Sequence, residues 1–284
     1  MMPIERWNWD DVRIFLAAMR APSLRQAADV LGVSHPTARR RLHGLETRIG
    51  MTLFERRHDG LHATSQAAAL LPAAEAVEKA MHAIARAAQA ADPTLRGPVR
   101  VSMPSGGFAR LLIPALADFN RQWPEVDVIL QRSNAMSDLS QREADIAVRL
   151  QRLGRSPPDD LAGRRVGTLH RAVYGAGDCW IGWYGEERDR DWITRSPFPD
   201  LPSRGGFDDP LIQVAACEAG MGLTWLPCYL GDPTLPRITA PTPHWDIWVL
   251  VHPDLRKNPR LRVFRDFLVA RLRALGPILE GRTA

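Results

Sequence analysis

The sequence is poor in cysteine and in long apolar runs, and each shortage excludes a class of protein. Its three cysteines, Cys179, Cys217 and Cys228, are widely spaced and odd in number, which favours a reducing compartment over a disulfide-stapled secreted fold. No apolar run reaches the roughly 18 residues that a membrane-spanning helix needs, and Glu5 and Asp10 interrupt the stretch where an export signal would be apolar. We therefore expect a cytoplasmic protein with no membrane partner.

The common signatures of catalytic and metal sites are also missing. The eight histidines show no His-Glu-x-x-His spacing, the cysteines form no Cys-x-x-Cys pair, and Ser105 does not lie in a Gly-x-Ser-x-Gly elbow. We expect no enzyme activity, no metal and no cofactor. Redox sensing through Cys217 and Cys228 stays open as an alternative, although Cys217 falls on the apolar face of a predicted helix, where thiols pack as small hydrophobic groups.

Lysine is scarce, and the basic charge of the chain is carried by arginine. Residues 1–66 contain ten arginines against seven acidic residues, a net charge of +3, within a total of +5 for 284 residues. GC-rich codon usage explains the abundance of arginine more simply than nucleic-acid binding does. Only the positions of the arginines can therefore indicate an anionic partner.

Three helices are predicted in the first 50 residues. Apolar spacing of i, i+3, i+4 and i+7 indicates helices over residues 12–19 and 24–31, and Gly32 supplies a tight turn after the second. Ser34 is a good N-cap for a third helix, which tolerates Pro36 in its first turn. The buried face of this third helix is predicted to comprise Ala38, Leu42, Leu45 and Ile49.

The third helix is expected to turn its arginines outward. At 100° per residue Arg40 lies about 200° from Ala38, in the middle of the exposed face. An arginine there suits bidentate contact with guanine in a major groove, and the short helix and turn before it favour a helix-turn-helix over an ordinary solvated arginine run. The predicted DNA contacts of this helix are Ser34, Pro36, Thr37, Arg39, Arg40 and Arg41.

A basic hairpin is predicted directly after the third helix. Residues 53–64 read LFERRHDGLHAT, two short extended runs around Asp59-Gly60, with Arg56, Arg57 and His58 at the tip. Such a wing can reach the DNA backbone or the minor groove, and the alternative is a surface loop with incidental charge.

Residues 23–64 closely resemble the signature region of the LysR-type transcriptional regulators. Arg39, where that family more often has serine, and Ala67, where it often has glycine, depart from the pattern. The resemblance implies a sequence-specific regulator of double-stranded DNA with an α/β fold: an all-α winged helix-turn-helix in residues 1–65, a linker helix in 66–92 and a two-lobed effector domain in 93–284. The matching positions include Ala27-Ala28, Leu31-Gly32-Val33-Ser34, Pro36, Arg40, Leu45-Glu46, Gly50, Leu53-Phe54-Glu55-Arg56 and Thr64.

The linker helix is predicted to pair with a second copy of the chain. Its apolar positions alternate spacings of four and three, as in a coiled-coil seam, and a twofold dimer or a tetramer suits a pseudo-palindromic DNA site. The alternative is a lone helix packed on its own domain. Pro72 is expected to bend the first turn of this helix. The predicted seam comprises Leu70, Ala74, Val77, Met81, Ile84 and Ala88.

Strands alternate with helices after Asp92-Pro93, which indicates a parallel sheet covered by helices. The LysR resemblance continues more weakly here, as in READIAVRL at 142–150, and implies a periplasmic-binding-protein-like fold. Lobe I would span about 97–168 and 246–284, and lobe II about 169–245. Between Tyr174 and Pro202 the chain lacks the clear strand and helix usual in the family, so lobe II is expected to be reduced.

A small organic effector, anionic by the nature of the predicted site, is expected in the cleft between the lobes. Ser105 and Gly106 lie between a strand and its helix, where the helix dipole favours an anion, although Ser105 alternatively only caps that helix. Arg149 is placed at the end of a strand and alternatively pairs with a carboxylate. A regulator without ligand control is the other alternative, and RNA polymerase is a further candidate partner. The predicted effector contacts are Ser105, Gly106, Arg149, Phe207 and Thr224.

Overall fold

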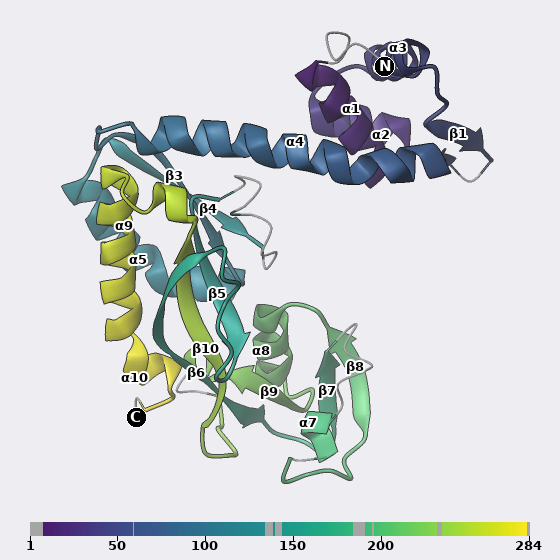
Figure 1. The fold of residues 1–284 in the computed structure, drawn as a ribbon. Helices are drawn as coiled ribbons and strands as arrows, with labels where there is room; N and C mark the ends of the chain where they lie inside the picture. The colour runs from purple at the N-terminus through teal and green to yellow at the C-terminus, as the bar shows by residue number, and fades with distance from the viewer. Residues whose placement is uncertain are drawn as a thin grey trace. The chain divides into compact units, whose positions relative to one another are not determined.

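The computed structural model divides the chain into two compact units, Met1–Ala85 and Arg86–Ala284 (Figure 1), here called the N-terminal and C-terminal units. No helix in the described part of the chain is long and apolar enough to cross a membrane. The described residues are 8–58, 60–133, 139, 144–183, 191–194, 196–231 and 235–282.

The N-terminal unit begins with three helices, α1 (Trp9–Arg20), α2 (Leu24–Leu31) and α3 (His35–Ile49). Side chains cap each of them as their sequences favour: the Ser23 hydroxyl accepts from the Gln26 N–H at α2, and Ser34 does the same at α3. The three helices enclose an apolar core. Its most deeply buried members include Ile14, Phe15, Leu16, Ala27, Ala38, Leu45 and Leu53.

A two-stranded hairpin, here called the wing, follows α3. It consists of β1 (Phe54–Arg57) and β2 (Gly60–Ala63), paired antiparallel with Arg57 opposite Gly60. Gly60 is the first residue of β2, so it does not lie in the turn that was predicted around Asp59-Gly60. Asp59 itself and the side chain of Arg56 lie outside the described structure.

Helix α4 (Ser65–Ala90) begins in the N-terminal unit and ends in the C-terminal unit. The Thr64 hydroxyl accepts from the Ala67 N–H at its start, 3.2 Å away. Pro72 lies inside the helix and not in its first turn, so the expected bend of the first turn is wrong. The reason is that the helix starts at Ser65, a full seven residues before the proline.

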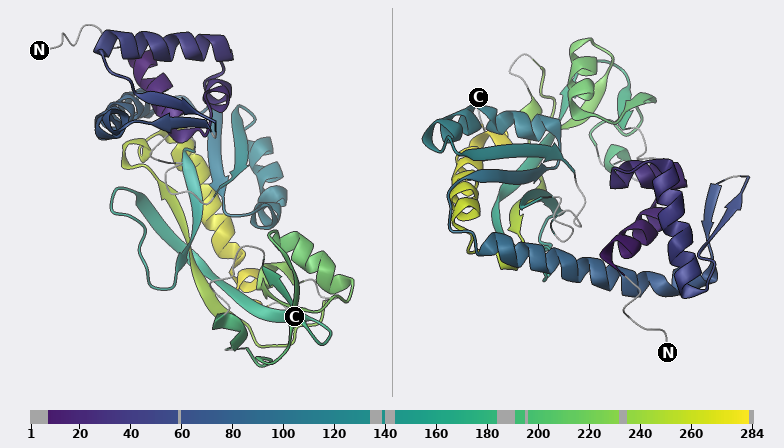
Figure 2. Two further views of the ribbon diagram at one scale, coloured as in Figure 1. Left: turned by 90° about the vertical axis from the view of Figure 1, so that its right-hand side faces the viewer. Right: turned by 90° about the horizontal axis from the view of Figure 1, so that it is seen from above.

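The sheet of lobe I in the C-terminal unit contains three parallel strands, and two long antiparallel strands lie beside them. β4 (Val126–Arg132), β3 (Gly97–Met103) and β5 (Ile146–Arg152) are parallel neighbours. β10 (Thr242–Val251) then pairs antiparallel with β5 and with β6 (Ala162–Gly175). Figure 2 shows β6 and β10 running together from lobe I towards lobe II, as expected for paired crossover strands.

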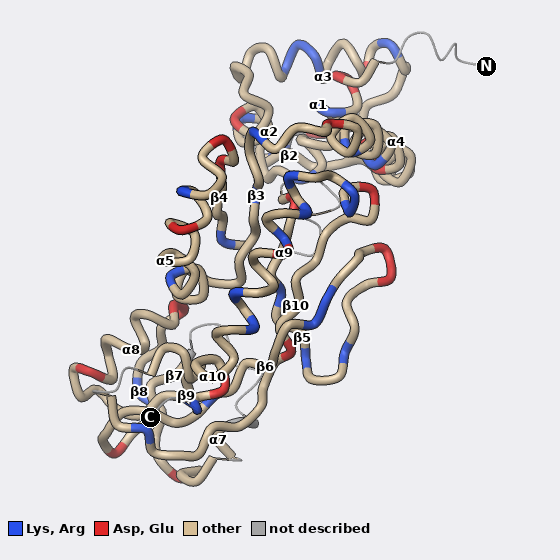
Figure 3. Tube along the Cα trace, turned by 90° about the vertical axis from the view of Figure 1, so that its left-hand side faces the viewer, with Lys and Arg blue, Asp and Glu red and all other residues tan. Residues whose placement is uncertain are grey.

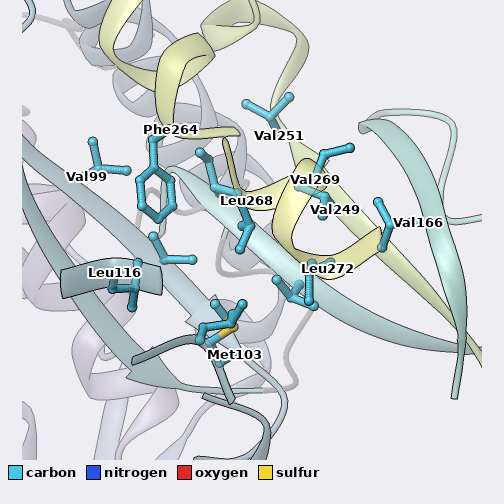
Figure 4. Packing of buried hydrophobic residues seen from close by; sticks show 14 of the residues in the cluster. Val99, Met103, Leu116, Val166, Val249, Val251, Phe264, Leu268, Val269 and Leu272 are labelled. Carbon is cyan, nitrogen blue, oxygen red and sulfur yellow. The ribbon is translucent and has the colours of Figure 1, made fainter. Parts of the chain in front are cut away.

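Two helices, α5 (Gly106–Gln122) and α9 (Pro259–Ala274), enclose the main core against these strands (Figure 4). Phe264 of α9 meets Phe119 of α5 edge to face, with ring centroids 5.0 Å apart. Val99 and Val249 contribute from the strands below them. This packing joins the start and the end of the C-terminal unit in one hydrophobic core, because α5 follows the first strand of the unit and α9 follows its last.

Lobe II extends the same sheet with β9 (Leu223–Pro227), β7 (Trp180–Trp183) and β8 (Ser203–Phe207), and α8 (Pro210–Glu218) packs on it. The expectation of no clear strand after Tyr174 is wrong, because β7 forms there around Trp180. That side chain is fully buried, and its indole N–H donates to the Phe198 carbonyl at 2.9 Å. The helix described between β7 and β8, α7 (Asp191–Thr194), is a single turn.

Candidate functional site

The exposed face of α3 carries Arg40, which is predicted to read bases, and its neighbour Arg39. Ala38 and Leu42 are buried, whereas Arg39 and Arg40 are exposed and have no ion-pair or hydrogen-bond partner among the described residues. Figure 3 shows the basic positions of α3 as a blue run on the tube. The Ser34 hydroxyl contacts Thr37 twice, at the backbone N (3.4 Å) and at Oγ1 (2.9 Å). Both hydroxyls therefore lie at the N-terminal end of this face.

Arg41 has a different environment from its two neighbours. Its guanidinium lies 3.7 Å from the Asp10 carboxylate of α1, and both side chains are largely exposed. An exposed pair of this kind contributes little to stability, so Arg41 can exchange Asp10 for a phosphate. Arg48, at the other end of α3, forms an ion pair with the buried carboxylate of Asp11 and fixes α3 to the start of α1.

A hollow of about 500 Å³ separates α3 from the wing. Glu46 lines this hollow, and its Oε1 accepts from the backbone N–H groups of Leu53 (2.8 Å) and Phe54 (3.1 Å). Glu46 belongs to the signature region, but its role as an acceptor for the wing was not predicted from the sequence. The residues that line this hollow are Leu24, His35, Pro36, Arg39, Arg40, Leu42, His43, Glu46, Phe54 and Leu61.

Replacing Glu46 by alanine is expected to lower the free energy of unfolding of the N-terminal unit by roughly 1 to 3 kcal/mol, because two backbone N–H groups lose a charged acceptor. Glu46→Gln is the matched control, since its amide oxygen can still accept both hydrogen bonds. Chemical denaturation of the full chain, followed by circular dichroism, measures the difference. Equal destabilisation by the two variants would contradict a role for the shared acceptor.

The wing presents its described basic residues to solvent. Arg57 lies 3.0 Å from the Glu55 carboxylate in a pair that is more than half exposed on both sides, and His58 is exposed in the loop. The contact predicted for the Arg56 side chain lies outside the described residues.

The α4 seam is divided between two surroundings. Ala74 is buried in the core of its own N-terminal unit, and Leu70 packs against that core. These two positions contact their own unit, so their place in the predicted dimer seam is wrong. A double contact from Arg20 of α1 to the Glu78 carboxylate, at 2.9 and 2.7 Å, fixes α4 there. The remaining seam positions are Val77, which is 43% exposed, Ile84, which is 64% exposed, the half-buried Met81 and the exposed Ala88.

The predicted anion site at the start of α5 is already in contact with lobe II. The Ser105 hydroxyl caps α5 by accepting from the Phe108 N–H (3.1 Å), and it lies 3.3 Å from the Tyr229 hydroxyl. The Tyr229 ring also packs edge to face on Phe108, and burial raises the pKa of its phenol. Gly106 is the first residue of α5. The capping interpretation of Ser105 is therefore confirmed, and its contact with Tyr229 was not predicted from the sequence.

Arg149 is buried in the middle of β5, so its expected place at the strand end is wrong. Its Nη1 donates to the backbone carbonyls of Ser102 (3.3 Å) and Val148 (2.9 Å). The strand continues to Arg152 because β10 pairs with all of it, which the sequence pattern of β5 alone does not reveal.

Phe207 and Thr224 are joined through the buried amide of Gln213 in α8. Gln213 Nε2 donates to the carbonyls of Gly182 (2.8 Å) and Phe207 (3.2 Å), and its Oε1 accepts from the Thr224 hydroxyl (2.5 Å). Thr224 is fully buried, so its hydroxyl is bonded inside lobe II and is not open to a cleft. Phe207, at the end of β8, is half-buried.

The three cysteines are free and buried. Burial raises the pKa of the Cys217 thiol to about 11, so the reactive thiolate is scarce at neutral pH. Among the described residues no group of three or more metal-ligating side chains converges.

Comparison with known proteins agrees with these two units. Residues 9–68 match the bacterial regulatory helix-turn-helix family of the lysR type, and residues 92–273 match the LysR substrate binding domain. The chain is 34% identical over 268 residues to the Mau operon transcriptional activator of Paracoccus denitrificans, covering 90% of this chain and 93% of the relative. It is 24% identical over 294 residues to the regulator CrgA of Neisseria meningitidis serogroup C (strain 8013), covering 93% and 97%.

Solved structures share the fold. CrgA from Neisseria meningitidis, a LysR-type transcriptional regulator, aligns with a TM-score of 0.54 at 22% identity, over 94% of this chain and 99% of that one. The Vibrio cholerae virulence activator AphB aligns with a TM-score of 0.57 at 18% identity, over 93% and 99%. With a DNA-binding helix-turn-helix and a substrate-binding domain in one chain, the protein belongs to the LysR family of transcriptional regulators.

Proposed function

We propose that this regulator reads its operator chiefly through Arg40 of α3, with Arg39, Thr37 and the wing contacting the adjacent backbone. The supporting observation is that Arg39 and Arg40 are exposed and have no partner among the described residues, on a helix whose opposite face is buried. A guanidinium held there needs no internal bond to break before it meets a guanine edge. In this proposal the DNA-binding domain comprises residues 1–65, the linker helix 66–92 and the regulatory domain 93–284.

Arg40→Ala is expected to weaken binding to the operator by roughly 1 to 3 kcal/mol and to leave affinity for random duplexes almost unchanged. Fluorescence anisotropy on both duplexes measures the two losses. The operator is first selected from a random pool by the wild-type protein. Arg121→Ala, which removes an exposed arginine of α5, is the control. Equal losses on operator and random DNA would show that Arg40 contacts only the backbone.

The operator is read by two copies of the chain in this proposal. The exposed apolar part of α4, formed by Val77, Met81, Ile84 and Ala88, is the surface on which a second α4 would pack. Two recognition helices related by a twofold axis match two half-sites of a pseudo-palindrome. The relative from Paracoccus denitrificans is named as a transcriptional activator, and by that likeness we include RNA polymerase among the proposed partners.

A small organic anion is the proposed effector, with Ser105, Gly106 and Phe207 as its proposed contacts. The start of α5 supplies backbone N–H groups and a positive dipole end, which favour a carboxylate. A thermal-shift screen of the full chain with small organic acids, each paired with its neutral amide, tests this proposal, since a true effector raises the melting temperature in a concentration-dependent way. Acids and amides that act alike would argue against an anion.

A regulator without ligand control is the second candidate, and one observation favours it. Ser105 is already engaged by the Phe108 N–H and by the Tyr229 hydroxyl, so its hydroxyl has partners without a ligand. Redox control through Cys217 has less support, because its raised pKa and its burial disfavour the reactive thiolate. A screen in which no acid shifts the melting temperature would favour the ligand-independent candidate.

A further inference from the structure

The last 34 residues of the chain are strongly basic. Residues 251–284 contain eight arginines and lysines against three acidic residues, a net charge of +5, which equals the net charge of the whole chain. Residues 169–245, which form lobe II, contain six basic and ten acidic residues, a net charge of −4. The C-terminal unit is therefore electrically polarised, so a polyanion is attracted to one part of it and repelled by the other.

Exposed basic residues gather where α9 begins. Residues 256–258 link the short helix η3 (Pro253–Leu255) to α9, and the Arg262 N–H in the first turn of α9 donates to the Asn258 carbonyl at 2.9 Å. The buried Arg260 side chain donates to the Arg96 carbonyl, which holds the segment before β3 beside this link. The exposed cations around this point, here called the lobe I basic end, are Arg96, Arg256, Lys257 and Arg262.

The acidic residues near the lobe I basic end do not neutralise it, because each already has a basic partner. The four cations of the basic end themselves have no hydrogen-bond or ion-pair partner for their side chains among the described residues. Their charge is therefore available to an anion from outside the chain. The pairs that occupy the neighbouring acids are Asp92 with Arg260 (3.3 Å), Asp254 with Arg86 (3.0 Å) and Asp266 with Arg265 (3.0 Å).

This surface suits a phosphate backbone better than a protein partner. Protein interfaces are centred on aromatic or aliphatic anchors that become buried, and charged residues are depleted at their core. In the described part of the chain no aromatic side chain is exposed at the basic end, and Leu95, at 38% exposure, is the large apolar neighbour of Arg96. Several unpaired cations without such an anchor match the regular charges of a duplex.

We propose that the lobe I basic end contacts the backbone of DNA outside the segment that the helix-turn-helix reads. This inference rests on the proposed DNA binding and adds a second contact surface, in the C-terminal unit. Helix α4, which begins in the N-terminal unit, joins lobe I beside this surface, since the Asn258 amide donates to the Gln89 carbonyl at 2.7 Å. Contacts to phosphates carry no sequence information, so the surface lengthens the bound segment and adds affinity.

The test compares the double variant Arg256→Gln/Lys257→Gln with the wild-type chain on two duplexes, one that ends at the operator and one that extends beyond it on both sides. On the extended duplex the variant is expected to bind on the order of tenfold more weakly, and the slope of log K against log salt to fall in magnitude by about two. On the short duplex both quantities should match those of the wild type. Fluorescence anisotropy over a range of salt concentrations measures them.

Arg110→Gln/Arg204→Gln is the matched control, because it removes two exposed arginines from α5 and β8 of the same unit and changes the net charge equally. It should leave binding to both duplexes unchanged. The exchange Arg256→Lys/Lys257→Arg keeps both charges and should keep the salt slope. Equal melting temperatures of the variants and the wild-type chain exclude misfolding as the cause of weaker binding.

The outcomes separate this inference from the proposed function. If the two double Gln variants behave alike on the extended duplex while the wild-type chain binds its operator, the basic end does not touch DNA and the proposed function stands. A loss of equal size on both duplexes would place the contact within the operator and overturn the inference. Unchanged DNA binding with weaker transcription by RNA polymerase in vitro would assign the surface to the polymerase instead. If the wild-type chain binds no operator, the proposed function fails and the inference fails with it.

Discussion

Ile84→Asp is expected to turn the regulator into a monomer and to weaken its binding to an operator with two half-sites by about 10²- to 10⁴-fold. Ile84 is 64% exposed in the C-terminal half of α4, on the same helical face as the exposed Val77. The Leu70 and Ala74 part of α4 is already packed in the core of its own unit. Exposed β-branched residues further along the same helix therefore indicate a surface for a partner. A carboxylate there would be desolvated on pairing with a second helix, whereas it is solvated in the monomer. Without the dimer, each half-site binds independently and the gain from linkage is lost.

Sedimentation and anisotropy on one-half-site and two-half-site duplexes measure the two effects together. Ala76→Asp is the control, because it introduces the same charge into the same helix at an exposed position about 120° away from the seam. It should leave both the dimer and the affinity unchanged. A dimeric Ile84→Asp protein with wild-type affinity for the two-half-site duplex would place the interface elsewhere.

The helix-turn-helix could be predicted because every local signal in it is consistent. Ser23 and Ser34 cap the helices that they were expected to cap, and Gly32 takes the left-handed conformation, with a φ of 66°, that ends α2. The apolar stripe from Ala38 to Ile49 is buried, which leaves Arg40 outside by geometry alone. Such information is local, within about four residues, and needs no knowledge of the rest of the fold.

The sequence could not show which partner each apolar face has. The heptad spacing in α4 is continuous from Leu70 to Ala88, yet Ala74 is buried against the winged helix and Ile84 is exposed. Periodicity reveals that a helix face is apolar, and it does not tell whether the same chain or a second copy covers it. A signal was present in Glu78, because a carboxylate four residues after Ala74 can pair with the basic end of α1, as it does with Arg20.

Contacts between segments that are distant in the chain could not be predicted from the sequence either. Tyr229 approaches Ser105 from 124 residues away, and Gln213 joins three strands of lobe II through one amide. The position of the wing depends in the same way on Gly60, where a Cβ would lie 2.9 Å from the Pro22 carbonyl oxygen.

Phe264→Ala is expected to lower the free energy of unfolding of the C-terminal unit by about 3 to 5 kcal/mol. Phe264 is fully buried where α9 meets α5 and the sheet, and its ring packs at 90° to that of Phe119. Its removal leaves a cavity bounded by elements from both ends of the unit, which cannot all move inward together. A loss of this size is a large part of the stability of an ordinary domain.

Phe267→Ala is the matched control, since Phe267 lies one turn further along α9, is only half-buried and also contacts Phe119, at 4.8 Å. Its loss is expected to be clearly smaller, because its neighbours and water can occupy the space that it leaves. Denaturant titration of the full chain gives both values. Affinity for a random duplex no longer than the operator, measured where the variants remain folded, is expected to be unchanged, since the residues proposed to contact a duplex of that length all lie in the N-terminal unit. Equal losses of stability for the two variants would show that Phe264 does not occupy the centre of this core.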